Sequence, residues 1–124
     1  MKRFFYAIVA AAVIALSIGL FVSLNSRVEK TEHLGGYTEK YYFFKKLVGE
    51  RTYLGDLLEG RTATYHGNGN VKSEWTYLKG KKQGLAKQYT LDGNLRYEDD
   101  YIEDRRVSRK EYDDRGNVVK HSGA

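Results

Sequence analysis

The sequence predicts an all-β protein: a single-layer antiparallel meander of repeated β-hairpins, preceded by one N-terminal hydrophobic helix. Two observations support this fold class. The first is a period of 24 residues, at which glycine, tyrosine and glutamate recur in register along the chain. The second is the alternation of apolar or aromatic residues with polar ones on both sides of glycine-containing turns, which is typical of hairpins. A period this short indicates units that bury surface only against their neighbours.

Five columns of residues carry the period. Glycine or serine recurs at Gly36, Gly60, Gly84 and Ser108, and again as Gly69, Gly93 and Gly116; tyrosine recurs at Tyr41, Tyr65 and Tyr89 and at Tyr53, Tyr77 and Tyr101; glutamate recurs at Glu50, Glu74 and Glu98. From residue 36 onward, tyrosine replaces much of the aliphatic content of an ordinary domain. We therefore expect a sheet with amphipathic rings in the positions that aliphatic side chains take in an ordinary domain.

The N-terminal part, residues 1–26, predicts a transmembrane anchor or a signal segment. Lys2 and Arg3 precede a run from Phe4 to Leu24 that only two serines and a glycine interrupt. As a helix this run rises about 31 Å, the thickness of a hydrocarbon core. Small residues at a cleavage site are missing, which favours an uncleaved anchor over a cleaved signal. The basic N-terminus predicts a cytoplasmic start with extracytoplasmic repeats.

Residues 27–35 are polar and lack periodicity, so they predict a linker. The repeats then divide as 36–59, 60–83, 84–107 and 108–121. Within each hairpin we expect a turn at Gly69, Gly93 or Gly116, and between hairpins a structural glycine at Gly60 or Gly84. About eight short strands result, with the less regular first and last copies acting as caps.

Composition excludes several classes of chemistry. The chain has no cysteine, so it has neither disulfides nor thiolate metal sites. The three histidines are far apart, and the carboxylates at 99–104 lack the frame of a calcium loop. No acid–base pair or nucleophile–base set can be assembled, so we expect no enzyme, no cofactor and no bound metal. The net charge of +5 is dispersed, which argues against nucleic acid, and nothing indicates a small-molecule substrate.

The aromatic residues are the candidate binding site. They are Tyr53, Tyr65, Trp75, Tyr77, Tyr89, Tyr97 and Tyr101. Two readings stay open: the rings pack on one another as the core of the sheet, or part of the stripe remains open for a partner. A single-layer sheet has no second layer to cover its aromatic face. Tyrosine and tryptophan are also the side chains that dominate protein interfaces.

The stretches YHGNGNVKSEWTYLKGKKQG (65–84) and YTLDGNLRYEDDYIEDRRVS (89–108), with YDDRGNVVK (112–120) as a partial copy, resemble the MORN-repeat family in its bacterial, antitoxin-like variant. The resemblance covers about residues 36–120. It implies a protein-interaction module or scaffold. Several bacterial members are regarded as antitoxins, and phospholipid contact has also been suggested for the family.

Together these features predict a membrane-tethered repeat module that serves as a protein–protein interaction scaffold of the cell envelope. One alternative is an antitoxin or immunity-type protein, secreted or periplasmic after signal cleavage, that neutralises a toxin. Another is a glycan- or peptidoglycan-binding module that uses stacked tyrosines. The identity of the partner, the oligomeric state and the openness of the aromatic face are left open.

Overall fold

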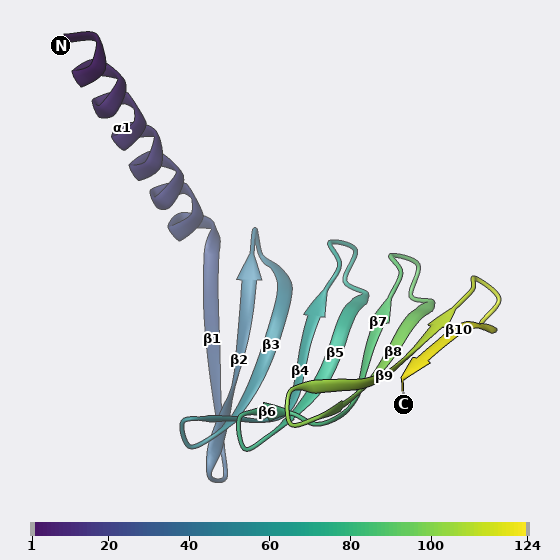
Figure 1. Ribbon diagram of the computed structural model, residues 1–124. Coiled ribbons are helices and arrows are strands. Elements are labelled where there is room, and N and C mark those ends of the chain that lie inside the picture. The colour runs from purple at the N-terminus through teal and green to yellow at the C-terminus, as the bar shows by residue number, and fades with distance from the viewer. Residues whose placement is uncertain (1, 124) are drawn as a thin grey trace.

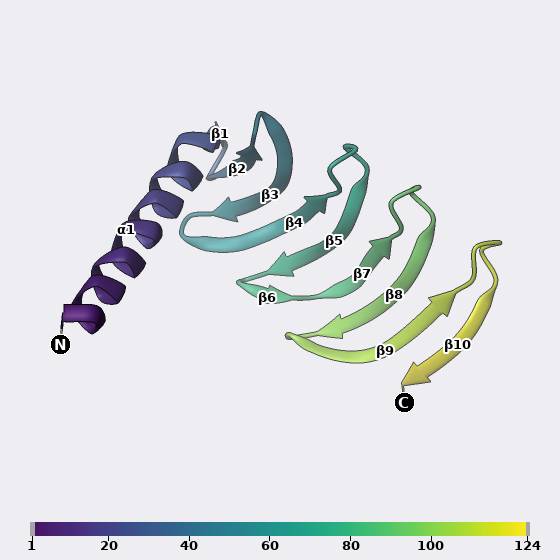
Figure 2. The same cartoon turned by 90° about the horizontal axis from the view of Figure 1, so that it is seen from above.

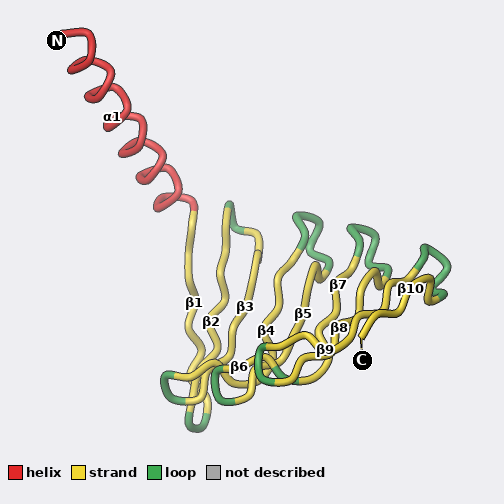
Figure 3. Tube along the Cα trace, viewed as in Figure 1, coloured by secondary structure: helices red, strands yellow, loops and turns green. Residues whose placement is uncertain are grey.

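The computed structural model describes residues 2–123, including the side chains of residues 7–8 and 10–123. One N-terminal helix is followed by a ten-stranded antiparallel sheet (Figures 1 and 3). The elements are α1 (Lys2–Asn25), β1 (Ser26–His33), β2 (Gly36–Phe43), β3 (Lys46–Leu54), β4 (Leu57–Tyr65), β5 (Val71–Leu78), β6 (Lys81–Lys82), β7 (Gly84–Tyr89), β8 (Leu95–Ile102), β9 (Arg105–Tyr112) and β10 (Val118–Gly123). The predicted all-β antiparallel meander with one N-terminal helix is therefore confirmed.

The sheet is a meander in which each strand except β6 pairs with the next main strand along the chain. The order runs from β1 to β5 and then from β7 to β10, while the two-residue strand β6 pairs with β5 beside β7. The longer strands bend along their length, so the sheet is curved when seen from above (Figure 2). No second layer lies over either face of the described sheet (Figures 1 and 2).

Because the sheet is a single layer, it has almost no closed core. Among the described side chains, Ala63 is the one buried apolar residue, and Thr62 and Asp99 are buried polar ones. Most aromatic rings are half-buried, because each packs against its neighbours and leaves its outer side open. Stability must therefore come from cross-strand pairs spread over both faces.

The turns inside the hairpins require glycine. Gly69, Gly93 and Gly116 have φ of 92°, 89° and 82°, which non-glycine residues rarely adopt. In each turn the glycine N–H donates to the carbonyl three residues earlier, at 2.9 to 3.0 Å. The turn between β2 and β3 differs: Phe44 and Lys45 take φ of 47° and 64° and form a two-residue reversal without glycine.

Replacing Gly93 with alanine is expected to lower the free energy of unfolding by about 1–2 kcal/mol, the cost of a left-handed backbone for a residue with a Cβ. The added Cβ meets nothing closer than the Asn70 amide nitrogen at 3.9 Å, so the cost is conformational and not steric. Gly67→Ala is the matched control, because Gly67 lies in an open turn without positive φ. Urea denaturation of both variants measures the difference, and equal effects would contradict this account.

The segment 27–35, predicted as a linker, instead forms the edge strand β1 and its turn. Eight residues of β1 pair in register with β2, from Ser26 opposite Phe43 to His33 opposite Gly36. Sequence periodicity missed this strand because it is polar on both sides. Its charges pair along the strand, Arg27 with Glu29 at 2.8 Å and Lys30 with Glu32 at 2.9 Å. Charged side chains are a usual way to protect a sheet edge from pairing with other sheets.

The helix α1 stands apart from the sheet (Figure 1). Its described side chains are exposed except that of Asn25, and its aromatic contact with the sheet is that of Phe21 with Phe44, whose ring centroids lie 5.7 Å apart. No helix in the described part of the chain is long and apolar enough to cross a membrane. The predicted single-pass anchor over residues 4–24, with a cytoplasmic N-terminus and extracytoplasmic repeats, is contradicted by that finding.

Candidate functional site: the two faces of the sheet

The strand register assigns each side chain to one of two faces, since paired residues of antiparallel strands project to the same side and alternate residues share a face. Arg51 pairs with Thr62, and Thr62 pairs with Trp75. Ser73, two residues before Trp75, pairs with Gln88, which pairs with Tyr97. These residues therefore share one side, the tyrosine–tryptophan face. Its half-buried aromatic members are Tyr37, Tyr41, Tyr53, Trp75, Tyr77, Tyr97 and Tyr101.

The opposite side is the charged face. One row crosses it with one residue from each paired strand: Glu29, Lys40, Glu50, Ala63, Glu74, Lys87, Glu98, Lys110 and His121. Charges alternate along most of this row. Where two glutamates flank Ala63, Arg61 bonds to both, with its Nε 3.0 Å from an oxygen of Glu74. Opposite charges on neighbouring strands stabilise the pairing.

The seven aromatic residues predicted as one binding stripe divide between the two faces. Tyr53, Trp75, Tyr77, Tyr97 and Tyr101 lie together on the tyrosine–tryptophan face. Tyr65 and Tyr89 belong to the charged face, because they lie two residues after Ala63 and Lys87. A register shift lies next to each of these two tyrosines, just before the hairpin turn. Tyr37 and Tyr41, which the prediction did not include in the stripe, complete the aromatic face.

Cations lie over the rings of the tyrosine–tryptophan face. The Lys82 ammonium is 5.1 Å from the Trp75 ring centroid and 5.3 Å from that of Tyr101. The Arg51 guanidinium lies 5.4 Å from the ring of Tyr41. An interaction with the Tyr53 hydroxyl is the largest contribution that raises the pKa of Arg51 above its ordinary value. The face thus presents aromatic rings and positive charge together, a combination suited to recognition.

A shallow hollow of about 230 Å³ lies on this face between β2 and β5. Tyr41, Arg51, Thr62, Thr64 and Trp75 contribute to its lining, and Gly49 leaves room between them. The Thr62 hydroxyl and the Trp75 indole N–H are buried and have no hydrogen-bond partner among the described residues. A buried donor without an acceptor costs about 1–3 kcal/mol, so this pair of atoms needs an explanation.

Asp99 and Arg109 form the most enclosed ion pair of the sheet. The Asp99 side chain is 3% exposed, and the Arg109 Nε and Nη2 donate to its two carboxylate oxygens at 2.6 and 2.7 Å. Arg106 adds a weaker approach at 4.0 Å, and the Arg109 guanidinium lies 4.7 Å from the ring of Tyr97. The hydrogen bond with Asp99 raises the pKa of Arg109. This two-point pairing fixes β8 to β9.

On the charged face, Tyr89 and Glu74 form a titratable pair. The Tyr89 hydroxyl donates to Glu74 at 2.7 Å, and this bond, with a smaller contribution from Arg61, holds the pKa of Glu74 below its ordinary value of 4.5. Burial and the same bond raise the pKa of Tyr89 to about 12. Both groups therefore keep their neutral-pH charge states: carboxylate for Glu74 and phenol for Tyr89.

Because the pKa of Glu74 is lowered in the folded state, its contribution to stability is present above about pH 4.5 and is lost as the pH falls through the folded value. Tyr89→Phe is expected to cost about 1 kcal/mol at pH 7 and progressively less toward pH 3. Urea denaturation across this range measures the effect. Tyr112→Phe is the control, because the Tyr112 hydroxyl bonds to no described side chain. A Tyr89→Phe deficit that stays constant with pH would contradict the assignment to Glu74.

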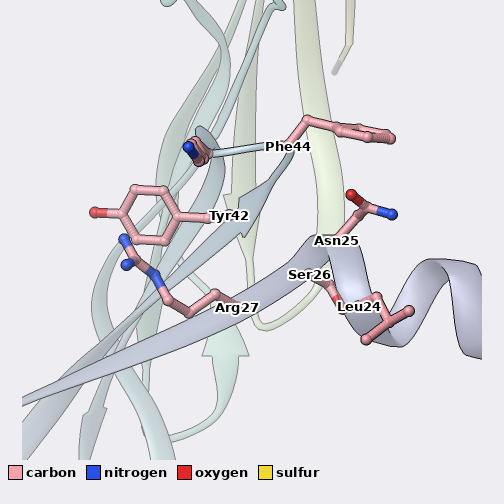
Figure 4. Close-up of a pocket in the computed structure, with 7 residues that line it drawn as sticks. Leu24, Asn25, Ser26, Arg27, Tyr42 and Phe44 are labelled. Carbon is pink, nitrogen blue, oxygen red and sulfur yellow. The ribbon is translucent and has the colours of Figure 1, made fainter.

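A second hollow, of about 300 Å³, lies where α1 meets β1 and β2 (Figure 4). Leu24, Asn25 and Ser26 at the junction of α1 and β1 contribute to its lining, together with Tyr42 and Phe44. The Phe44 N–H donates to the Asn25 carbonyl at 2.9 Å, which closes the corner. These groups connect the helix to the sheet, and they include no pair of side chains suited to proton transfer or nucleophilic attack.

No group of three or more histidine, aspartate or glutamate side chains within the described residues is placed to hold a metal ion. His66 is held instead by the Tyr89 carbonyl, 3.0 Å from its ring nitrogen. Asp99, one of the carboxylates near 99–104, is engaged by Arg109, while Asp104 accepts from the Lys82 N–H at 2.8 Å. These carboxylates therefore act in strand and turn contacts.

Comparison with known proteins adds little to this description. No protein-family model matches the chain, and no curated protein matches it. Among solved structures, the chain is similar to a mutant of S. aureus TarM in complex with fondaparinux, alpha-GlcNAc-glycerol and UDP, at 8% sequence identity and a TM-score of 0.49. The match covers 64% of this chain and 16% of that chain, so the region spans a small part of the TarM protein. A likeness at this level carries no argument about function.

Proposed function

We propose that this chain is a non-enzymatic, MORN-like repeat module with a 24-residue period, and that it binds a protein partner through its tyrosine–tryptophan face. One observation carries the proposal: seven half-buried aromatic rings share one side of a sheet that has no second layer. Domains bury their apolar faces against another element, and here the described chain supplies none. A partner protein is the element that this face lacks.

The composition of the face also supports protein binding. Interfaces are enriched in tyrosine, tryptophan and arginine, and their energetic centres are rings that lose their remaining exposure on binding. Half-buried rings are already ordered by their neighbours, as in the stack of Tyr37 on Tyr53 with centroids 4.7 Å apart. A partner that covers them therefore pays little additional side-chain entropy. The charged face is internally paired along most of its central row, and so it offers less for a partner to satisfy.

The proposal is tested by partner capture with the full chain and with variants truncated on one face only. We expect captured protein to be lost when the tyrosine–tryptophan face is truncated and retained when the charged face is truncated. Equal retention by both variants, or equal loss from both while each remains folded, would contradict binding through this face.

A further inference from the structure

Two cations of the tyrosine–tryptophan face, Arg51 and Lys82, have no acidic partner in the described part of the chain. Arg51 and Lys82 form no ion pair there, although nine such pairs involve other residues. Glu39 is the register partner of Arg51, yet its carboxylate accepts from the Tyr41 hydroxyl instead. Both cations are held over rings, so their positions are set in advance of binding.

The hollow beside Arg51 points to the same chemistry. The Thr62 hydroxyl and the Trp75 indole N–H can both donate, and neither has an acceptor in the described chain. Both belong to side chains that line the hollow, together with Arg51. An oxygen acceptor is the group that both donors lack. A carboxylate suits the site best, because it accepts several hydrogen bonds and also neutralises the guanidinium.

We propose that the tyrosine–tryptophan face binds an extended acidic segment of the partner protein, with one carboxylate at Arg51 in the hollow and a second carboxylate at Lys82. This inference rests on the proposed function and specifies the chemistry of the partner. The net charge of +5 favours encounter with an acidic partner. Trp75 lies between the two cation positions and contacts the segment that joins the two carboxylates.

The register gives the spacing of the two carboxylates. Arg51 on β3 and Lys82 on β6 are separated by β4 and β5, and Lys82 pairs with Tyr77, two residues along the strand from Trp75. Three strand spacings and one two-residue step place the two backbones about 16 Å apart. In an extended peptide, residues four apart are separated by about 13–14 Å, a difference that the long side chains can close. We therefore expect acidic residues at positions i and i+4.

The test uses the full chain and three acetylated, amidated nonapeptides built on serine and threonine. The first has glutamate at positions 3 and 7, the second has glutamine there, and the third has glutamate at positions 3 and 4. Trp75 is the only tryptophan, so its emission reports occupation of this face directly. We expect the first peptide to shift the Trp75 emission and to bind at least about tenfold more tightly than the second and third peptides. Each of these two peptides loses charge-assisted hydrogen bonds that the first peptide makes.

Variants locate the binding site. Arg51→Gln and Lys82→Gln are each expected to weaken the first peptide about tenfold, and Arg51→Lys to restore part of the loss. Arg115→Gln, which removes the same charge from the turn at 114–117, is the matched control and should leave affinity within about twofold. Thermal unfolding of each variant confirms that it is folded. Equal binding of the glutamate and glutamine peptides, an equal loss in Arg115→Gln, or an unchanged Trp75 emission would overturn the inference.

The outcome separates this inference from the proposed function. If the acidic peptide fails but a captured partner still requires the tyrosine–tryptophan face, then only the acidic chemistry is wrong. If capture is insensitive to truncation of that face, the proposed function itself fails, whatever the peptides do.

Discussion

Arg109→Met is expected to lower the free energy of unfolding by about 2–3 kcal/mol, the largest single-residue effect that we predict for this sheet. The substitution leaves the Asp99 carboxylate, 3% exposed, without the two hydrogen bonds at 2.6 and 2.7 Å that compensate its burial. Arg106, at 4.0 Å and largely exposed, recovers part of the loss. For this reason we place the effect below the 3–5 kcal/mol typical of fully buried pairs.

Two further variants separate the buried charge from the other contacts of Arg109. Lys110→Met removes a cation from the next residue on the opposite face, where the ammonium is 3.4 Å from Glu98 and the side chain is 43% exposed. It should cost no more than about 0.5 kcal/mol. The double variant Asp99→Leu with Arg109→Met replaces the pair by apolar side chains and should recover most of the stability. Chemical denaturation at pH 7 measures all three. A double variant as unstable as Arg109→Met alone would show that packing, and not the orphaned carboxylate, sets the cost.

The general architecture follows from local sequence signals, but the Asp99–Arg109 ion pair could not be predicted from them. Alternation around glycine turns is a property of adjacent residues, so it predicts the hairpins and the antiparallel meander. Asp99 stands in a run of acidic residues that looks solvated from sequence. Its burial depends on Arg109, ten residues away on the next strand, and only the register of β8 against β9 brings the two together.

The composition of the aromatic site failed to follow from sequence for a related reason. By alternation, Tyr65 and Tyr89 lie on the same side of their strands as Ala63 and Lys87. The register pairs Ala63 with Glu74 and Lys87 with Glu98, which alternate with Trp75 and Tyr97 and so face the other way. Residue spacing counted along one strand contains no information about this cross-strand register. The tyrosines therefore formed one stripe in the prediction and two groups in the structure.

In the N-terminal part, the composition of a segment did not predict its structure. Polarity without periodicity predicted a linker at 27–35. This segment instead contributes the edge strand, because its backbone pairs with β2 and such pairing does not depend on side-chain polarity. Edge strands in particular tolerate charge on both sides. Apolar composition predicted a membrane anchor at 4–24, and the structure describes no helix that meets the requirement. Composition alone was therefore wrong about the linker and about the single-pass anchor.

The second large effect concerns binding. Trp75→Ala combined with Tyr97→Ala is expected to reduce the affinity for a captured partner by at least about 100-fold, because each truncated ring is of the type that contributes 2 kcal/mol or more at the centre of an interface. Both residues lie on the tyrosine–tryptophan face, near Lys82 and Arg109 respectively. Titration of the purified partner against the immobilised full chain measures the change.

The opposite face of the sheet supplies the control. Tyr65→Ala combined with Tyr89→Ala removes two half-buried rings from the same two hairpins, β4–β5 and β7–β8, and should destabilise the sheet by a similar amount, since the apolar area lost is comparable. It leaves the tyrosine–tryptophan face intact, so affinity should stay within about threefold of the unsubstituted chain, the range of contacts outside an interface. If the two double variants unfold at similar urea concentrations and only the first loses the partner, the loss reports binding and not folding. If both lose it equally while still folded, the partner does not distinguish the faces, and these rings serve the sheet alone.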